Sequence, residues 1–303
     1  MNRITARVTS LLTLFLLTAC SPETSERPLQ YSSSPAAASK QIYRLAIHPL
    51  YNPQKLSEAY QPLIDHLNKQ IPNVHFELEA SRDYQVYEQK FRNREPAFLL
   101  PNPWQTLQAL KVGYHVIATA GDAEDFKGIF IVRKDSGIKS PNQLIGKSVS
   151  YPSPTALAAA IMPQYFLHTK GININRDIKN VYVGSQESSI MNAYLGQVAA
   201  GATWPPPWRS FQKTHPAEAA QLTVIWETPS LINNSVMVRD DVPQHIRSRV
   251  QNVLTALQQT SGGKGILSGM ETSRFLHATD SNYDIVRVYI KRFEKEVRPV
   301  ESK

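Results

Sequence analysis

The chain has 303 residues, of which 42% are hydrophobic and 19% are charged, and its formal net charge is +8. This length allows two domains, or one large α/β domain, with a sizeable core. The basic residues are dispersed and form no long run, which argues against nucleic-acid binding. One cysteine and eight scattered histidines provide neither a disulfide nor the close ligand spacing of a metal site.

The first twenty residues have the pattern of a bacterial export signal. Arg3 and Arg7 precede an apolar run at residues 8–17, and a Leu-Thr-Ala-Cys sequence ends at Cys20. A basic start, a short apolar stretch and small residues before the cleavage point are typical of secretory signals. The ending resembles the bacterial lipoprotein box, which predicts a signal peptide at residues 1–19 and a lipidated Cys20. A plain signal peptide with an incidental cysteine is the alternative.

Residues 20–41 predict a flexible tether. The segment is rich in Ser, Pro, Ala and Glu and shows no hydrophobic periodicity. We expect it to hold a folded body off the surface of a membrane.

The body begins with alternating strands and helices, which is the pattern of a parallel α/β sheet covered on both faces. The predicted strands are residues 42–47, 74–79, 97–100 and 114–120, and the predicted helices are residues 57–70 and 84–92 and one that opens at residue 104.

Sheets of this kind bind ligands beyond the carboxyl ends of their strands. Tyr51 and Asn102 lie in loops at such ends, and Tyr84 begins a nearby helix. These side chains are therefore candidate ligand contacts, although each would also serve to fill space in the core.

The next stretch combines a strand, a Pro-Ser-Pro turn and a helix N-terminus. Residues 147–151 predict the strand, and residues 155–170 predict the helix, which we expect Ser153 or Thr155 to cap. The N–H groups of the first turn would then lie beside two hydroxyls at the positive end of the helix dipole. This arrangement forms an anion site without lysine or arginine, although an ordinary capped helix has the same pattern.

Two further strand ends carry polar or aromatic side chains. Gln186 and Glu187 are expected at the N-terminus of the helix that follows a short strand. Thr203 and Trp204 follow a run of small residues, and the three prolines after them predict a stiff turn between Trp204 and Trp208. The two indoles would either wall a cleft or pack on the surface of the protein.

Two β-rich runs, at residues 128–133 and 234–239, bracket a segment with its own α/β pattern. We therefore predict two lobes joined by two hinge strands. Lobe 1 would comprise residues 42–127 and 234–303, and lobe 2 would comprise residues 128–233.

The C-terminal part predicts two more helices. Residues 242–260 are amphipathic, the glycine-rich residues 262–265 are expected to break that helix, and residues 284–293 predict a final packing helix.

Common enzyme motifs are missing from the sequence. A phosphate-binding loop ending at Ser148 would need glycine where Pro141 stands, and neither Gly-x-Ser-x-Gly nor His-Glu-x-x-His occurs. We therefore predict no enzymatic activity. An extracytoplasmic hydrolase is the alternative, and it would turn over phosphoesters.

The order of these motifs along residues 42–297 resembles the type 2 periplasmic solute-binding proteins of ABC importers, and most closely the branch for phosphonate, phosphite and phosphate. The resemblance implies an α/β fold of two lobes, each with a mostly parallel sheet, that closes on an oxyanion. The matching features are Tyr51-Asn52-Pro53, residues 60–67, Asp83-Tyr84, residues 140–148 before the Ser/Thr turn, and residues 184–187.

Carried over by position, the family's site implies that Ser153 and Thr155 bind ligand oxygens together with backbone N–H groups. Tyr51 and Tyr84 would close over the ligand from lobe 1. The sequence departs from the family where Pro154 interrupts the Ser/Thr turn.

Two more departures are Ala156 in place of a hydroxyl and Gln186 at a position where the family often has histidine. Fewer hydroxyls and more indole imply a different or larger ligand. Glu187, facing Tyr51 or Trp204, would then hold an amino group by charge and cation–π attraction.

We predict a lipid-anchored, extracytoplasmic binding protein that captures a small oxyanion and delivers it to an ABC permease. The alternative is a ligand-sensing module for a membrane-bound histidine kinase or cyclase. Neither a metal nor a cofactor is expected. The predicted ligand contacts are Tyr51, Tyr84, Asn102, Ser153, Thr155, Gln186, Glu187, Thr203 and Trp204.

Overall fold

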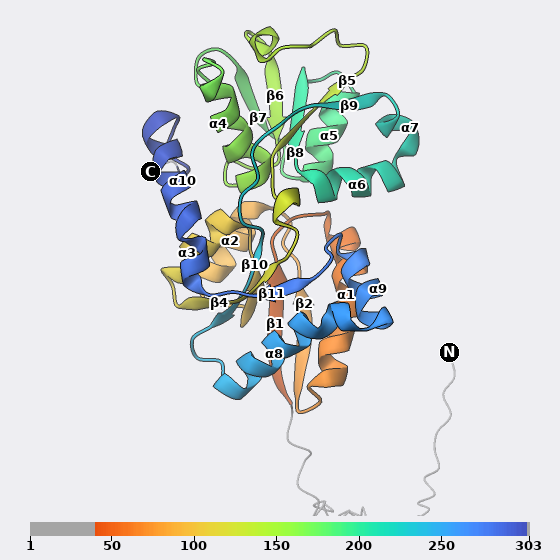
Figure 1. Ribbon diagram of the computed structural model, residues 1–303, viewed down its shortest axis with the longest axis vertical. Coiled ribbons are helices and arrows are strands. Elements are labelled where there is room, and N and C mark those ends of the chain that lie inside the picture. The colour runs from red at the N-terminus through yellow and green to blue at the C-terminus, as the bar shows by residue number, and fades with distance from the viewer. Residues whose placement is uncertain (1–39, 302–303) are drawn as a thin grey trace, which may run out of the picture. The chain divides into compact units, whose positions relative to one another are not determined.

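The computed structural model describes residues 40–301, which belong to one compact unit (Figure 1). The predicted signal peptide, Cys20 and nearly all of the predicted tether lie outside the described residues. Gln41, which the sequence analysis assigns to the tether, is the first residue of a strand. Within the described part of the chain, no helix has the length and apolar character needed to span a membrane.

The first sheet has six strands in the order β11-β4-β10-β3-β1-β2. Its pairings make β1, β2, β3 and β4 run in one direction, while β10 and β11 run in the other. The mostly parallel sheet predicted from the sequence is therefore confirmed, with β11 as an unpredicted edge strand. The strands are β1 (Gln41–Ile47), β2 (Val74–Glu79), β3 (Phe98–Leu100), β4 (Tyr114–Ala120), β10 (Ser235–Arg239) and β11 (Phe275–His277).

The second sheet has five strands in the order β7-β6-β8-β5-β9. Here β6 pairs in parallel with β7 and β8, and β5 lies antiparallel between β8 and β9. Four of its strands again share one direction. The strands are β5 (Ile129–Arg133), β6 (Ser148–Tyr151), β7 (Lys179–Tyr182), β8 (Ala200–Thr203) and β9 (Leu222–Glu227).

Helices cover both sheets, and their ends follow local capping chemistry. Asn52 caps the first helix by accepting a hydrogen bond from the N–H of Lys55, and Asn102 forms a capping box with Gln105. The helices are α1 (Pro53–Gln70), α2 (Tyr84–Arg92), α3 (Pro103–Leu110), α4 (Met162–Thr169), α5 (Gln186–Tyr194), α6 (Pro205–Thr214), α7 (Pro216–Ala219), α8 (Gln244–Ala256), α9 (Ser261–Gly269) and α10 (Asp284–Glu296).

Short helical turns complete the described secondary structure. Four are 3₁₀ turns, and a fifth, at Leu157–Ile161, is π-helical and runs directly into α4. The 3₁₀ turns are Ala123–Asp125, Pro141–Leu144, Leu257–Gln259 and Asp280–Tyr283.

We call the part built on the six-stranded sheet lobe 1 and the part built on the five-stranded sheet lobe 2. The chain crosses between them after β4 and again after β9. Beside lobe 2 the two crossings are bonded to each other: Gly128 donates its N–H to Oγ1 of Thr228, and Thr228 donates its N–H to the carbonyl of Gly128, both at 2.9 Å.

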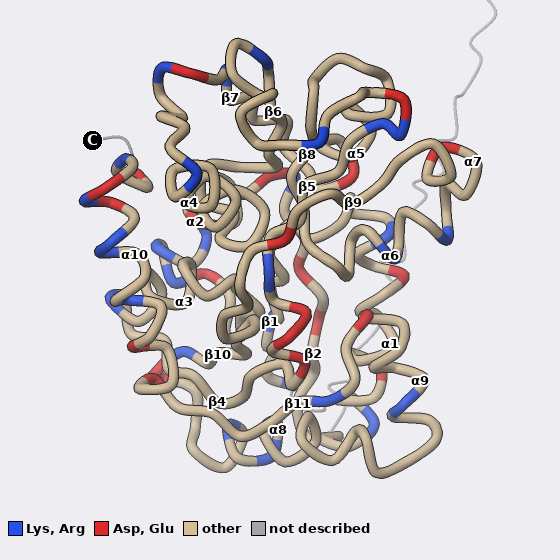
Figure 2. The backbone as a smooth tube through the Cα atoms, turned by 45° about the horizontal axis from the view of Figure 1, so that its top comes forward, with Lys and Arg blue, Asp and Glu red and all other residues tan. Residues whose placement is uncertain are grey.

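The C-terminal helix forms a third tie between the lobes. α10 packs on α3 of lobe 1, and its end reaches lobe 2, where Tyr165 donates a 3.0 Å hydrogen bond to Glu296. Just beyond the helix, Arg298 donates to the carbonyl of Pro154 and to the side chain of Gln164, both at 2.9 Å. Figure 2 shows basic residues along α10 and over both lobes rather than gathered on one face.

The stiff turn predicted between Trp204 and Trp208 is wrong. Pro205, Pro206 and Pro207 instead form the first turn of α6. Proline is tolerated there because the first N–H groups of a helix have no partner within it, and its fixed φ suits the helix.

The predicted break at residues 262–265 is also wrong, since these glycines lie within α9. The helical run is interrupted just before them, where Thr260 accepts a hydrogen bond from the N–H of Gly263 and caps the new helix. A Cβ at Gly263 would lie 2.0 Å from the carbonyl oxygen of Leu257, so this close approach requires glycine.

Candidate functional site

A small pocket lies between the two lobes, and its free space, about 10 Å³ for the centre of a water molecule, is room for roughly one water. All of its lining residues are buried. None of those residues, all within the described range 40–301, is a lysine or an arginine. The lining comprises His48, Tyr84 and Asn102 from lobe 1, Phe126 and Asn234 from the crossings, and residues 156–159, Gln186 and Trp204 from lobe 2.

Backbone N–H groups form one wall of this pocket. The helix that leads into α4 begins at Leu157, two residues later than predicted, and its first turn is π-helical, with the N–H of Ile161 bonded to the carbonyl of Ala156. In the described structure the N–H groups of Leu157, Ala158 and Ala159 meet no acceptor. Unpaired N–H groups are expected at a helix N-terminus, where the dipole favours an anion.

The predicted cap by Ser153 or Thr155 is wrong. No side chain caps this helix, whose N-cap is Ala156. Thr155 instead donates its hydroxyl proton to Oε1 of Glu88 at 2.6 Å, and Ser153 lies 3.0 Å from the hydroxyl of Thr155. Neither hydroxyl lines the pocket. A buried carboxylate needs hydrogen-bond donors. Glu88 therefore accepts the hydrogen bond from Thr155 that was expected to go to a bound anion.

Glu88 connects the lobes behind the pocket wall. It lies on α2, is almost fully buried, and also accepts a 3.1 Å hydrogen bond from Gln105. Burial raises the pKa of Glu88, while the hydrogen bonds from Thr155 and Gln105 act in the opposite direction. Asn102 adds a second bond between the lobes, from Nδ2 to the carbonyl of Thr155 at 3.2 Å.

A relay of three side chains fixes the direction of the Tyr84 hydroxyl. Thr203 donates to Oε1 of Gln186 at 2.8 Å, and Nε2 of Gln186 donates to the hydroxyl of Tyr84 at 3.0 Å. The proton of Tyr84 meets no acceptor among residues 40–301, so it is free to donate into the pocket. Burial raises the pKa of Tyr84, which keeps the phenol protonated.

His48 presents an acceptor to the same pocket. Its Nδ1 lies 2.9 Å from the carbonyl of Leu100, and a carbonyl only accepts, so Nδ1 carries a proton. Burial lowers the pKa of His48 to about 4, so the ring is neutral at neutral pH. Nε2 therefore holds a lone pair, and within the described structure no group donates to it.

Of the remaining predicted contacts, one lines the pocket and the others do not. Trp204 lines the pocket, with its ring centroid 5.4 Å from that of Phe126, whereas Thr203 only supports Gln186. Tyr51 is buried outside the pocket, beside the ammonium group of Lys55. Glu187 is partly exposed on α5 and does not line the pocket either.

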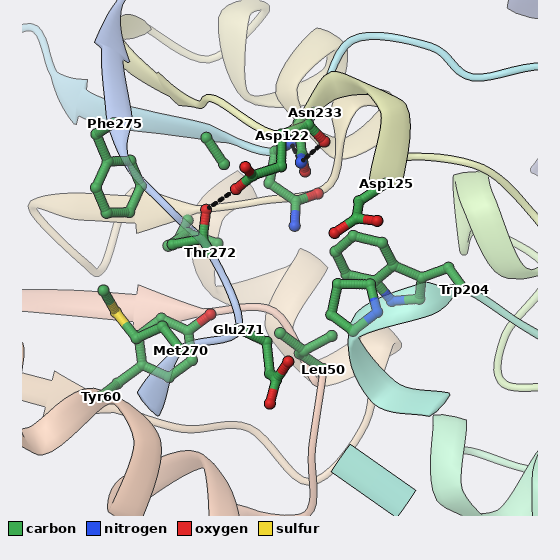
Figure 3. Close-up of a pocket in the computed structure, with 14 residues that line it drawn as sticks. Leu50, Tyr60, Asp122, Asp125, Trp204, Asn233, Met270, Glu271, Thr272 and Phe275 are labelled. Carbon is green, nitrogen blue, oxygen red and sulfur yellow. Dashed lines mark hydrogen bonds between the residues drawn. The ribbon is translucent and has the colours of Figure 1, made fainter. Parts of the chain in front are cut away.

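A second, larger pocket adjoins the first and shares Trp204 and Asn234 with it. Figure 3 shows Asp122, Asp125 and Glu271 among the residues that line this space, with the carboxylate of Asp122 turned to the hydroxyl of Thr272. Two of these acids are paired with Arg209, which lies 2.9 Å from Asp125 and 3.0 Å from Glu271.

Asp122 is held by hydrogen bonds from the backbone of Ser273 and the hydroxyl of Thr272. Burial opposes ionisation of Asp122, but these bonds outweigh it and lower its pKa. In the described part of the chain, no group of three or more acidic, histidine or cysteine side chains is arranged to hold a metal ion.

Sequence reasoning missed His48, Phe126 and Asn234. His48 stands directly after β1, so the rule that selected Tyr51 three residues later also points to it. The donors at residues 157–159 are backbone N–H groups, so the side chains at these positions do not reveal them. A helix start after a Ser/Thr turn is the only signal for them.

Residues 45–283 match the family described as the periplasmic substrate-binding protein of phosphonate ABC transporters. A probable ABC transporter phosphite binding protein, PhnD1 of Prochlorococcus marinus, is 22% identical over 278 residues, which cover 87% of this chain and 93% of that protein.

Two solved structures share the two-lobed fold. A binding protein component of an ABC phosphonate transporter from Pseudomonas aeruginosa has a TM-score of 0.79 at 15% identity, over 85% of this chain and 88% of that one. PhnD1 of Prochlorococcus marinus, in complex with methylphosphonate, has a TM-score of 0.77 at 21% identity, over 84% and 99%.

Proposed function

The chain belongs to the family of periplasmic substrate-binding proteins of phosphonate ABC transporters, and on that premise we propose that it captures a small phosphorus oxyanion in the pocket between its lobes. The observation that carries the proposal is the set of unpaired N–H groups at Leu157, Ala158 and Ala159, which line an enclosed pocket together with Tyr84. These donors suit a tetrahedral oxyanion, because each of its oxygens accepts several hydrogen bonds.

The size and charge of the site favour a small ligand. The free space is room for roughly one water molecule and is lined by neutral side chains, so the lobes would adjust around a small anion, which N–H dipoles and hydroxyls would hold. A substituent that passes Trp204 would enter the larger pocket, where Asp122, Asp125 and Glu271 would attract an amino group.

Closure of the lobes would enclose the ligand. In the proposed division, residues 42–127 and 234–303 form lobe 1 and residues 128–233 form lobe 2. The bonds from Thr155 to Glu88 and from Gln186 to Tyr84 join the lobes around the pocket. The filled, closed protein would then deliver its ligand to the ABC permease.

We test this function by isothermal titration of the full chain, purified in detergent, with methylphosphonate, phosphite, phosphate and 2-aminoethylphosphonate. Ligand at 100 times its Kd should add about 2.7 kcal/mol to the free energy of unfolding and raise the melting temperature. Failure of all four to bind would refute the proposal.

The same proposal includes export and a membrane anchor. Residues 1–19 would direct export, and a lipid on Cys20 would hold the protein at a membrane while the tether at residues 20–41 gives it reach. Cys20→Ser should move the protein from the membrane fraction of cells to the soluble fraction. Retention of this variant at the membrane would argue against the lipid anchor.

A further inference from the structure

We infer that His48 makes this pocket selective for an oxyanion that carries a proton, so that the site takes monoprotonated phosphorus oxyanions and rejects fully ionised tetrahedral anions such as sulfonates. The inference rests on the proposed function, because it assigns the class of ligand for the same pocket. Its basis is Nε2 of His48, an acceptor without a partner among residues 40–301, in a pocket that is also lined by hydrogen-bond donors.

The tautomer of His48 follows from its hydrogen bond. The side chain is 2% exposed, and its Nδ1 lies 2.9 Å from the carbonyl oxygen of Leu100. If the ring were turned over, a carbon atom would face that carbonyl and the bond would be lost. Nδ1 is therefore the protonated nitrogen, and Nε2 is the nitrogen with the lone pair.

The surroundings keep the ring neutral. Tyr84 and Tyr87 pack on it at ring-centroid distances of 6.1 and 6.5 Å. Burial raises the pKa of both phenols, so neither supplies a negative charge that would stabilise an imidazolium. Burial also lowers the pKa of His48 itself to about 4. At neutral pH Nε2 is therefore an acceptor.

The pocket thus offers both hydrogen-bond donors and hydrogen-bond acceptors. The N–H groups of residues 157–159 and the hydroxyl of Tyr84 donate to ionised oxygens, while Nε2 of His48 accepts. A second buried acceptor, Oδ1 of Asn234, also has no partner among residues 40–301 and belongs to a residue that lines the pocket. A ligand with one P–O–H group and two unprotonated oxygens that share a negative charge satisfies donors and acceptors together.

A sulfonate satisfies only half of this arrangement. All of its oxygens are acceptors, so one of them would face the lone pair of His48 in a buried site. Leaving a buried acceptor unpaired is costly, and sites built to bond a ligand proton discriminate strongly against analogues that lack it. We therefore expect at least about 100-fold weaker binding of an otherwise matched anion.

The test uses two probes of the same shape. Methylphosphonate monoanion and methanesulfonate are both tetrahedral, singly charged and methyl-substituted, and they differ by the acidic proton. Calorimetric titration of the full chain near pH 6 should give a Kd at least about 100-fold lower for methylphosphonate. Equal affinities would overturn the inference while leaving oxyanion binding intact. Binding of neither probe would overturn the proposed function and this inference with it.

The pH dependence of the unmodified protein provides a second measurement. Only the monoanion carries the required proton, so the affinity for methylphosphonate should fall about tenfold per pH unit above the second pKa of the ligand. The affinity for methanesulfonate should stay flat over the same range. A methylphosphonate affinity that rises with pH would show that the dianion is preferred, which contradicts the role of His48.

A pair of variants assigns the selectivity to His48. His48→Phe removes the acceptor, so the ratio of the two affinities should collapse to less than about tenfold. His48→Gln keeps an acceptor oxygen in the side chain and should retain more of the preference. A His48→Phe protein that folds, binds methylphosphonate and still discriminates 100-fold would refute the assignment.

Discussion

Thr155 of lobe 2 donates its hydroxyl proton to the buried carboxylate of Glu88 in lobe 1, across 2.6 Å. The two residues are 67 positions apart in the sequence, and their bond lies directly behind the wall of the interlobe pocket. The turn that precedes the free N–H groups is therefore held from the opposite lobe. A further bond, from Asn102 to the carbonyl of Thr155, holds the same residue.

Thr155→Val should destabilise the protein. Valine has nearly the same shape but no hydroxyl, so Oε1 of Glu88 keeps only the hydrogen bond from Gln105. We expect a loss of about 1–3 kcal/mol in the free energy of unfolding, measured by denaturant titration. The control is Thr223→Val on β9, where the hydroxyl makes only a 3.4 Å bond to a neighbouring carbonyl. Equal stability of the two variants would contradict a structural role for the bond to Glu88.

Tyr84→Phe should weaken methylphosphonate binding about tenfold, because it removes a donor that is free to reach the ligand and leaves Gln186 without its acceptor. Tyr87→Phe is a matched control on the same helix. The Tyr87 hydroxyl is buried, has no partner among residues 40–301 and does not line the pocket. That variant should bind normally and melt no earlier than the unmodified protein. Equal effects on affinity would remove Tyr84 from the site.

The buried, neutral His48 should make stability depend on pH. Its pKa is about 4 in the folded protein against an ordinary value of 6.5. The unfolded chain therefore binds the proton first, and stability falls as pH drops from about 6.5 towards 4. The total loss should be roughly 3 kcal/mol.

Denaturant titrations between pH 7 and about pH 4 measure the slope of the free energy of unfolding against pH. His48→Gln should lose this contribution to it, while His75→Gln, which changes a half-exposed side chain, should keep it. A slope in His48→Gln identical to that of the unmodified protein would show that the acid sensitivity comes from other groups.

Glu271→Gln should speed the release of ligand. Glu271 belongs to lobe 1 and is paired with Arg209 and Lys213 on α6 of lobe 2, so these ion pairs join the lobes at one edge of the cleft. Partly exposed pairs contribute little, so we expect a dissociation rate about two to five times faster at low salt. Added salt should shrink the difference.

Stopped-flow fluorescence measures this rate, because Trp204 lines the pocket and reports its occupancy. Asp135→Asn is the control, since it breaks the pair with Arg133 inside lobe 2. If Asp135→Asn released ligand as fast as Glu271→Gln, the faster release would not be due to the loss of ion pairs between the lobes.

Most of the fold could be predicted from the sequence, because hydrophobic periodicity determines where most helices and strands form. The bounds predicted for α2 and for the strands at residues 74–79 and 114–120 agree with the structure. The two β-rich runs that suggested two lobes became β5 and β10, one in each sheet. Local composition misled at the prolines after Trp204, which a first helical turn tolerates, and at the glycines of α9, where Thr260 caps a new helix despite them.

The site was less accessible, because its chemistry depends on partners far apart in the chain. The hydroxyl of Thr155 turns to Glu88, and the acceptor role of His48 depends on the carbonyl of Leu100, 52 residues away. Neither partner is visible from local sequence. The donors of residues 157–159 belong to the backbone and would be the same with other side chains.

The position of β10 has a consequence for the order in which the lobes fold. β10 lies between β3 and β4 and is the strand that joins the two halves of the six-stranded sheet. It begins at Ser235, after all of lobe 2, which is continuous in sequence. Lobe 2 can therefore complete its sheet without any segment of lobe 1, although β5 pairs with β9 nearly one hundred residues later, whereas lobe 1 needs β10, which follows the whole of lobe 2 in the sequence. During synthesis from the N-terminus, all strands of lobe 2 are made before the central strand of lobe 1, and we expect the sheet of lobe 2 to be completed first.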